Sequence, residues 1–221
     1  MDRAATRMLW TWPLLIAGLV GCDKPGASSV SWLPDPELDM TRPQTVAGPP
    51  RVKPAPVGEW APVSGYRPWK YIIVHHSATD SGSAASFDAM HRAKGWDELG
   101  YHFVIDNGSG GPDGRVEVGG RWKTQKWGAH TGGTPDNEYN NCGIGICLVG
   151  DFTRRNPTDV QLVSLARLTK YLMQACEIPP SRVIGHRDAP GAKTDCPGKT
   201  FYSYLCGTLR PDLVRFLASQ R

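Results

Sequence analysis

The sequence predicts an α/β fold, a single domain with a mixed central β-sheet flanked by helices and a site in a surface groove. Two apolar runs, at residues 71–74 and 143–150, are continuous rather than alternating, which is typical of strands covered on both faces. The segments between and after these runs carry helical periodicity. Elements in this order favour helices packed against a sheet.

The composition limits the classes of protein that need considering. The 221 residues suffice for one sizeable domain and shorter extensions, and abundant Gly (25) and Pro (19) predict many loops. The formal net charge of +4 is mild and no basic run accompanies it, so no nucleic acid partner is expected. Six cysteines are too few for a disulfide scaffold of this size.

Residues 1–21 have the features of an export signal. A start with two arginines precedes a mostly apolar stretch, residues 9–20, that is too short to span a membrane comfortably as a helix. The following LVGC resembles the bacterial lipobox, in which the chain is cut before the cysteine and the thiol receives a diacylglycerol. We therefore expect a lipoprotein anchored through Cys22 in the cell envelope, facing the periplasm or the outside. The alternative is an ordinary signal peptide with a chance cysteine, and inner and outer membrane both stay open.

Residues 22–66 are expected to form a lipidated N-terminus and a tether. The stretch after Cys22 holds nine prolines and no sustained apolar period, which predicts extended, poorly ordered chain. Trp32 and Trp60 leave open that parts of the segment wrap the domain as irregular structure.

The globular domain is expected at residues 67–221. After the strand at 71–74, residues 86–94 predict a short helix that ends at a glycine. Residues 102–105 and 115–118 predict a hairpin around a turn rich in Gly, Asp and Pro.

The second half of the domain contributes the central strand and the longest helix. Residues 119–142 lack periodicity and are expected to form a surface loop region, followed by the buried strand at 143–150. Thr158, with Gln161 three positions on, forms a capping box at the start of a helix that runs to about Cys176. A strand at 183–184 and a last helix with Pro211 in its first turn complete the domain.

Two histidines and a cysteine have the arrangement of a hydrolytic metal site. His75 follows the first strand, His186 follows the strand at 183–184, and Cys196 lies ten positions later in a loop rich in Pro and Gly. Two strand-end histidines and a loop thiolate make a three-ligand zinc site that keeps one position open. The spacing fits no structural zinc motif, although an unrelated histidine and cysteine remain the alternative.

Four segments in order resemble the zinc-dependent N-acetylmuramoyl-L-alanine amidases, a superfamily that includes phage amidase-type lysozymes and animal peptidoglycan recognition proteins. They are IIVHHSAT, GWDELGYHF, GIGICLVGDF and GHRDAPGAKTDCPG, and the match spans roughly residues 70–205. The resemblance implies a Zn²⁺ enzyme that hydrolyses the amide between N-acetylmuramic acid and the L-alanine of peptidoglycan stem peptides.

The resemblance assigns roles to particular residues. It implies His75, His186 and Cys196 as zinc ligands and Tyr101 as a catalytic residue. The family places a Lys or Thr two positions before its third ligand, and the run KTDC at 193–196 fits both patterns. Thr194 with Cys196 is favoured, while Lys193 with Asp195 as the third ligand stays open.

Other polar residues near these motifs allow a structural as well as a functional interpretation. His130 lies in a loop similar to one that lines the family's groove, and contact with substrate or a role in stabilising the loop are both open. Trp96 either stacks on substrate or packs in the core. We expect His76 and His102 to be packed or supporting residues and His91 to be solvated.

The sequence as a whole predicts a monomeric, membrane-anchored amidase of the cell wall, with peptidoglycan or muropeptides as partner. Two rivals remain: a recognition domain that binds muropeptide without cutting it, and a lipoprotein with structural zinc. The stem-peptide preference, the choice between intact wall and released fragments, and the pairing of Cys142, Cys147, Cys176 and Cys206 are open.

Overall fold

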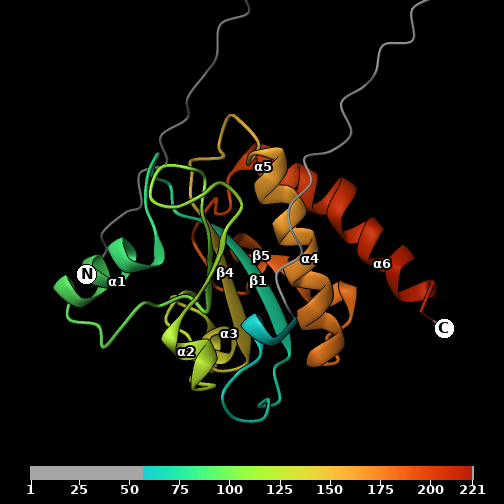
Figure 1. The fold of residues 1–221 in the computed structure, drawn as a ribbon, viewed down its shortest axis with the longest axis horizontal. Helices are drawn as coiled ribbons and strands as arrows, with labels where there is room; N and C mark the ends of the chain where they lie inside the picture. Colours follow the sequence, from blue (N-terminus) through green and yellow to red (C-terminus); the bar gives the residue numbers. More distant parts are fainter. Residues whose placement is uncertain (1–56, 221) are drawn as a thin grey trace, which may run out of the picture. The chain divides into compact units, whose positions relative to one another are not determined.

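The computed structural model describes residues 57–220. The expected signal peptide, the lipobox with Cys22 and most of the expected tether lie outside the described residues. Within them, a five-stranded sheet runs through the domain in the order β3-β2-β4-β1-β5 (Figure 1). The strands are β1 (Tyr71–His76), β2 (Phe103–Ile105), β3 (Val116–Val118), β4 (Gly143–Leu148) and β5 (Val183–Gly185).

The sheet is mixed, as the sequence predicts. β4 pairs in parallel with β1 and with β2, β5 pairs in parallel with β1, and β3 runs antiparallel to β2. β4 is the central strand and every one of its residues is buried, which explains its uninterrupted apolar character.

The two long crossovers place helices on opposite faces of this sheet. The chain passes from β1 to β2 through α1 (Ala84–Ala93), and from β4 to β5 through α4 (Asp159–Ala175). The two crossings run in opposite directions along the sheet, since β2 and β5 lie on opposite sides of the β4-β1 pair. Right-handed crossovers of opposite direction leave their helices on opposite faces.

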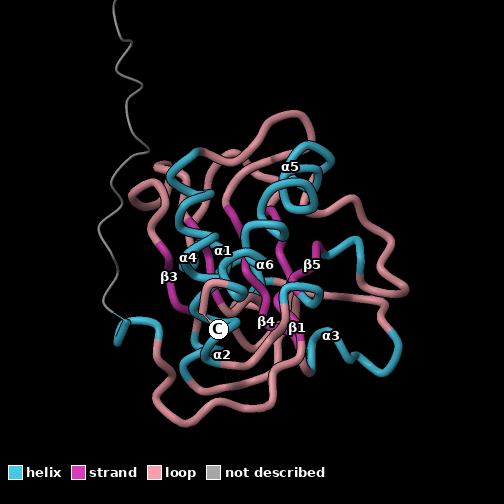
Figure 2. The backbone as a smooth tube through the Cα atoms, turned by 90° about the vertical axis from the view of Figure 1, so that its right-hand side faces the viewer, coloured by secondary structure: helices cyan, strands magenta, loops and turns pink. Residues whose placement is uncertain are grey.

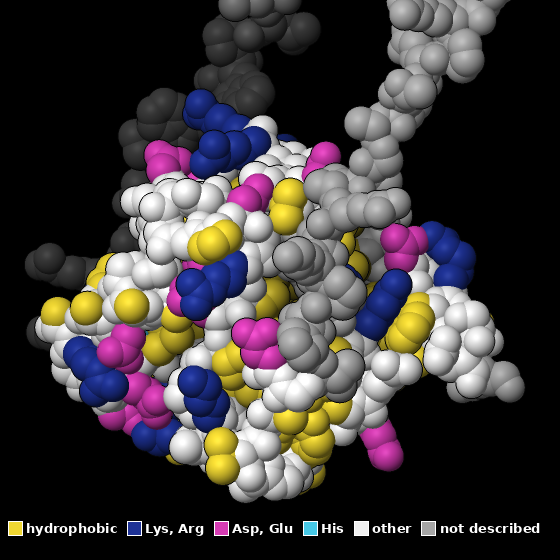
Figure 3. Space-filling model, viewed as in Figure 1, with side chains coloured by type: hydrophobic (Ala, Val, Ile, Leu, Met, Phe, Trp, Pro, Cys, Tyr) yellow, Lys and Arg dark blue, Asp and Glu magenta, His cyan; other side chains and the backbone are white. Residues whose placement is uncertain are grey.

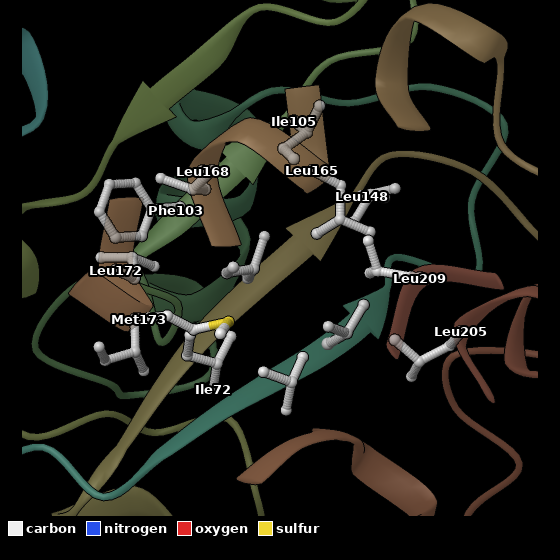
Figure 4. Packing of buried hydrophobic residues seen from close by; sticks show 14 of the residues in the cluster. Ile72, Phe103, Ile105, Leu148, Leu165, Leu168, Leu172, Met173, Leu205 and Leu209 are labelled. Carbon is white, nitrogen blue, oxygen red and sulfur yellow. The ribbon is translucent and has the colours of Figure 1, made fainter. Parts of the chain in front are cut away.

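The larger core lies on the α4 face. Figure 4 shows Leu168 and Leu172 of α4 beside Phe103, with Leu205 on the side of the C-terminal helices. These side chains are fully buried. The capping box predicted for α4 is confirmed. The Thr158 hydroxyl accepts from the Gln161 N–H, and the Gln161 side-chain oxygen accepts from the Thr158 N–H.

The other face carries a smaller cluster beneath α1, formed by Phe87, Leu99, Val104, Cys147 and Val149. Register places His75 opposite Cys147, and Cys147 opposite Val104, so the three side chains share this face. The α1 face therefore holds fewer apolar residues and leaves the end of β1 for polar ones.

The expectation of a surface loop at residues 119–142 is wrong. The segment contains α2 (Gly120–Lys123), the 3-10 turn η2 (Pro135–Asn137) and α3 (Glu138–Asn141), and Trp122 is completely buried. The Arg121 guanidinium, also buried, donates to the carbonyls of Leu99 and Trp127. Those bonds satisfy backbone carbonyls that lie outside helices and strands. Residues buried in this way do not produce a periodic hydrophobic pattern in the sequence.

The last residues of the expected tether belong to the folded domain. η1 (Val57–Trp60) is a 3-10 turn, Trp60 is buried, and the Trp122 indole N–H donates to the Trp60 carbonyl at 2.6 Å. Val63 N–H also donates to the Lys123 carbonyl. Residues 57–63 thus pack against the domain expected at residues 67–221, where Trp60 and Trp122 contact one another through the indole bond.

The C-terminal part contains more helix than the sequence analysis anticipates. Short 3-10 turns η3 (Pro180–Arg182) and η4 (His186–Asp188) flank β5, and α5 (Lys199–Tyr204) then runs through a π-helical stretch, η5 (Leu205–Leu209), into α6 (Arg210–Ala218). Pro211 lies in the first turn of α6, as predicted. Figure 2 shows α6 beside α4.

The surface matches the mild net charge. On the face in Figure 3, Lys and Arg lie interspersed with Asp and Glu, and no large area carries one sign. Among the helices of residues 57–220, none has the length and apolar character needed to cross a membrane.

Candidate metal centre

Three side chains far apart in the sequence meet where the parallel strands end. His75 lies near the end of β1, and His186 follows β5, the neighbour of β1 in the sheet. Parallel strands end at one edge of a sheet, which is the usual place for a site in this architecture. Cys196 arrives from the loop before α5, and the ligand atoms of the three residues lie within 4.8 Å of one another.

The spacing within the cluster suits a tetrahedral ion. His75 Nδ1 lies 3.7 Å from Cys196 Sγ. Zinc bonds of about 2.0–2.3 Å in tetrahedral geometry put two ligand atoms roughly 3.3–3.8 Å apart. The Nδ1 atom of His75, rather than Nε2, therefore faces the centre of the cluster.

Backbone bonds hold the cysteine loop against both histidine strands. Arg187 N–H donates to the Cys196 carbonyl at 2.9 Å, which ties the residue after His186 to the cysteine. His76 N–H, from the end of β1, approaches Cys196 Sγ at 3.4 Å. Asp188 accepts from the Gly185 N–H at 3.0 Å, which fixes the turn that carries His186.

Burial of the three side chains sets their protonation states in the absence of a cation. Burial lowers the pKa of His75 well below its ordinary value, with smaller effects from the neighbouring histidines, and burial lowers the pKa of His186 to about 4. Both rings are then neutral at pH 7 and offer lone pairs. Burial raises the pKa of the Cys196 thiol to about 12, against the opposing effect of the His76 N–H, so a thiolate there requires a nearby positive charge.

The donor set fits zinc. Two imidazoles and one thiol, with no carboxylate in the cluster, are the nitrogen and sulfur ligands that Zn²⁺ prefers. Asp195, the alternative third ligand, is largely exposed and pairs with Arg187 at 3.4 Å. Of the two candidates in the loop, the geometry brings Cys196 and not Asp195 to the histidines.

His130 is a direct neighbour of the cluster. Its Nδ1 lies 3.1 Å from His75 Nε2, and its Nε2 lies 3.2 Å from the Gly143 carbonyl oxygen. The ring lies flat over β4, where a Cβ on Gly145 would stand 2.5 Å from the His130 ring. The glycine in the middle of this strand therefore makes room for an imidazole.

Tyr101 and Trp96 line a hollow of about 210 Å³ that also reaches His130, the neighbour of the cluster. The Tyr101 ring centroid is 5.3 Å from that of His75, and burial, together with the nearby Cys147 and Cys196 thiols, raises the pKa of the phenol well above its usual range. The hydroxyl thus keeps its proton at neutral pH. Trp96 remains 40% exposed, which leaves its ring available to a ligand.

Thr194 and Lys193 differ in how the loop holds them. The Thr194 hydroxyl oxygen accepts from the Cys196 N–H at 3.1 Å, so its own proton is free for another acceptor. The side chain is half-buried, whereas Lys193 is exposed. The loop therefore fixes Thr194, not Lys193, relative to the cysteine.

The remaining histidines are structural, with one correction. His76 accepts from the Phe152 N–H, and His102 accepts from the Gly145 N–H and faces the Lys126 carbonyl, as expected for supporting residues. The expectation that His91 is solvated is wrong. It is 6% exposed and accepts from the Gly100 N–H, because the chain after α1 folds back over it.

Asn140 is a site residue that the sequence analysis does not single out. Its side-chain oxygen accepts from the N–H groups of both His130 and Thr131 at 2.8 Å, which fixes the loop above the cluster. Glycine inside a strand signals close approach of another group, so Gly145 offered a hint of the ring that lies on it. Nothing in the local pattern pointed to Asn140.

The described part of the chain contains no disulfide. The five cysteines from Cys142 onward are all free, and Cys147 is buried in β4 as a small core residue. No disulfide therefore braces residues 57–220.

Comparisons with known proteins agree with this architecture. The model of the family described as N-acetylmuramoyl-L-alanine amidase matches residues 65–199. The human N-acetylmuramoyl-L-alanine amidase is 31% identical over 156 residues, a match that covers 62% of this chain and 24% of the human protein. The chain thus matches about a quarter of the length of its curated mammalian relatives.

Solved structures with the same fold include peptidoglycan recognition proteins. Bumblebee PGRP-SA is 26% identical with a TM-score of 0.53, and the match covers 69% of this chain and 93% of that one. The complex of PGRP-LCa and PGRP-LCx ectodomains with tracheal cytotoxin contains a chain 27% identical, with a TM-score of 0.50, covering 67% and 92%. Because the family model covers more than half of the sequence, the chain belongs to the N-acetylmuramoyl-L-alanine amidase family.

Proposed function

We propose that this protein is a zinc-dependent amidase that hydrolyses the bond between N-acetylmuramic acid and L-alanine in peptidoglycan. The observation that carries the proposal is the cluster of His75, His186 and Cys196, whose ligand atoms lie within 4.8 Å of one another in a chain of the amidase family. A recognition domain needs a groove for its ligand, but it has no use for three convergent metal-binding groups beside that groove.

Zinc held by three protein ligands supplies two things that amide hydrolysis lacks at neutral pH: a bound water with a pKa near 7 and polarisation of the carbonyl. The remaining work falls to side chains of the hollow. Tyr101, whose hydroxyl stays protonated, donates to the oxyanion that forms when the amide carbonyl is attacked. The same hydroxyl is the candidate to pass a proton to the leaving amine.

Thr194 is the second donor in this proposal. Its oxygen is already engaged by the Cys196 N–H, so the hydroxyl proton is directed elsewhere and stabilises the oxyanion. Lys193, exposed on the same loop, is the alternative donor. The hollow lined by Trp96 and Tyr101 holds the substrate.

We further propose a place for this activity. The lipobox-like LVGC before residue 23 supports a protein anchored by lipid on Cys22 in the cell envelope, where peptidoglycan is the accessible polymer. The partner in the tracheal cytotoxin complex, a muropeptide, supports muropeptides as ligands of this fold. The protein is proposed to act as a monomer.

The test is product analysis on purified peptidoglycan with the full chain. Mass spectrometry is expected to find stem peptides that begin with free L-alanine and glycan without peptide, only when zinc is present. A chelator should abolish both products and added zinc should restore them. Zinc-loaded protein that binds the wall and releases neither product is instead a recognition domain. Unfolding upon chelation with no products at any stage points to structural zinc.

A further inference from the structure

We propose that His130 is a positioning residue for the metal centre: it accepts the Nε2 proton of His75 and so turns the Nδ1 lone pair of His75 toward the ion. The inference rests on the proposed metal centre, but it concerns hydrogen bonds of the chain itself. It gives His130 a role different from contact with substrate.

The direction of the proton follows from the fixed acceptor at the other end. His130 Nε2 faces the Gly143 carbonyl oxygen at 3.2 Å, and a carbonyl only accepts. Nε2 must therefore carry the proton of a neutral His130 ring, which leaves a lone pair on Nδ1. That atom faces His75 Nε2 at 3.1 Å.

His75 can complete this contact in one way. Two lone pairs would repel at 3.1 Å, so His75 Nε2 must donate. A neutral imidazole has a single N–H, which leaves His75 Nδ1 as a lone pair 3.7 Å from Cys196 Sγ. The tautomer that binds metal through Nδ1 is thus selected before any ion arrives.

The surroundings hold His130 in this orientation. Its backbone N–H is bound by the Asn140 side chain, and Gly145 leaves the space that its ring fills. The Thr131 hydroxyl lies 2.8 Å from the same Nδ1 and shares the lone pair with His75. His130 is 8% exposed, so water competes little for these bonds.

Such support matters because a histidine ligand has two tautomers and a ring that can turn. Outer partners that fix the tautomer and the ring typically change metal affinity by about 10- to 100-fold when mutated. The same magnitude is expected here, since His75 is the ligand that His130 contacts directly.

Two substitutions of similar size separate positioning from packing. In His130→Asn the side-chain oxygen stands near the place of Nδ1 and can still accept from His75. In His130→Gln the amide reaches the place of Nε2 and keeps the bond to Gly143, but leaves the His75 N–H without its acceptor. A purely structural role predicts that the two variants weaken zinc binding alike, or that Gln is the milder change.

The experiment measures the dissociation constant of Zn²⁺ by competition with a chelating dye, in protein whose metal-free thermal midpoint is recorded. His130→Gln is expected to bind zinc about 10- to 100-fold more weakly and His130→Asn to recover most of that loss. His91→Asn, a change of another buried histidine that does not contact His75, serves as the control and should bind like the wild type. Equal affinities for Gln and wild type would overturn the proposal.

A second measurement needs no variant. Long-range ¹H–¹⁵N spectra of the metal-free protein should show both His75 and His130 as Nε2–H tautomers, and an Nδ1–H tautomer at His75 would overturn the inference. Neither readout uses amide cleavage. Protein that shows these results without releasing wall products refutes the proposed function and leaves the role of His130 intact.

Discussion

At the scale of single residues, removing the Tyr101 hydroxyl tests the proposed mechanism while leaving the metal ligands in place. Tyr101 is not in the metal cluster, yet its ring lies 5.3 Å from that of His75. Tyr101→Phe should bind zinc like the wild type and lower kcat about 10²- to 10³-fold, the usual cost of one lost oxyanion donor. Zinc content and initial rates on a synthetic muramyl peptide check this. Full activity in Tyr101→Phe would remove the phenol from the mechanism.

The identity of the third ligand has its own paired test. Cys196→Ala removes a buried sulfur from the cluster, whereas Asp195→Ala removes an exposed carboxylate that pairs with Arg187. We expect Cys196→Ala to lose stoichiometric zinc and Asp195→Ala to retain it. Elemental analysis after dialysis distinguishes them. The reverse outcome would assign the ligand to Asp195, the pattern that the KTD sequence left open.

Sequence reasoning identifies these residues because each carries chemistry in a recognisable place. His75 and His186 follow apolar runs, and strand ends at one sheet edge bring them together. Asn140 instead binds the backbone of His130, and Gly145 leaves space for the His130 ring. Both roles depend on His130, which comes from another segment of the chain. Their roles become visible only when the segments are folded together.

At the scale of elements, β4 provides the seat for His130. A methyl group on Gly145 would stand 2.5 Å from the His130 ring, so the ring must shift and its contact with His75 is disturbed. Gly145→Ala should therefore weaken zinc binding in the same direction as His130→Gln, although it removes no polar group. Zinc titration checks this, with circular dichroism to verify the fold. Unchanged affinity would mean that the ring can move without consequence for the site.

The hairpin of β2 and β3 holds a carboxyl group that titrates near neutrality. Asp106 is completely buried and its carboxyl oxygens have no hydrogen-bond partner. Burial, together with the nearby Glu117, raises the pKa of Asp106 to about 7 despite Arg115. Glu117 in turn accepts from the Ala84 N–H at the start of α1.

This group makes stability depend on pH. Its folded pKa lies above the value of about 3.9 in an unfolded chain. Between these two values the native state binds more protons than the unfolded chain, so its stability falls as the pH rises from about 4 to about 7 and is level above that. The thermal midpoint should fall between about pH 4 and pH 7 more steeply in the wild type than in Asp106→Asn. Parallel curves for the two proteins would contradict this assignment.

Elements with a strong period are the ones that the sequence predicts well. β4 is a continuous apolar run and α4 has both its cap and its apolar stripe, so both are confirmed. The segment at 119–142 was missed because Arg121 and Trp122 are buried through specific bonds rather than through a repeating pattern. Such burial depends on the carbonyls that happen to lie nearby.

At the scale of the whole molecule, the domain extends to Val57. A chain that begins at residue 67 lacks Trp60 and leaves the Trp122 indole N–H without its acceptor. We expect its free energy of unfolding to be lower than that of a chain beginning at Val57 by about 3–5 kcal/mol, the usual cost of truncating a core Trp. It should therefore unfold at a lower temperature. Calorimetry of the two proteins checks this. Equal midpoints would show that residues 57–66 merely rest on the surface.

Residues 57–66 join the fold beside α2, where the parallel strands begin, while the three convergent ligands lie where those strands finish (Figures 1 and 2). In the lipid-anchored protein that we propose, the chain that leads to the anchor joins the domain at the end opposite the metal centre. In that arrangement, a large cross-linked polymer reaches the metal centre from the side opposite the anchor.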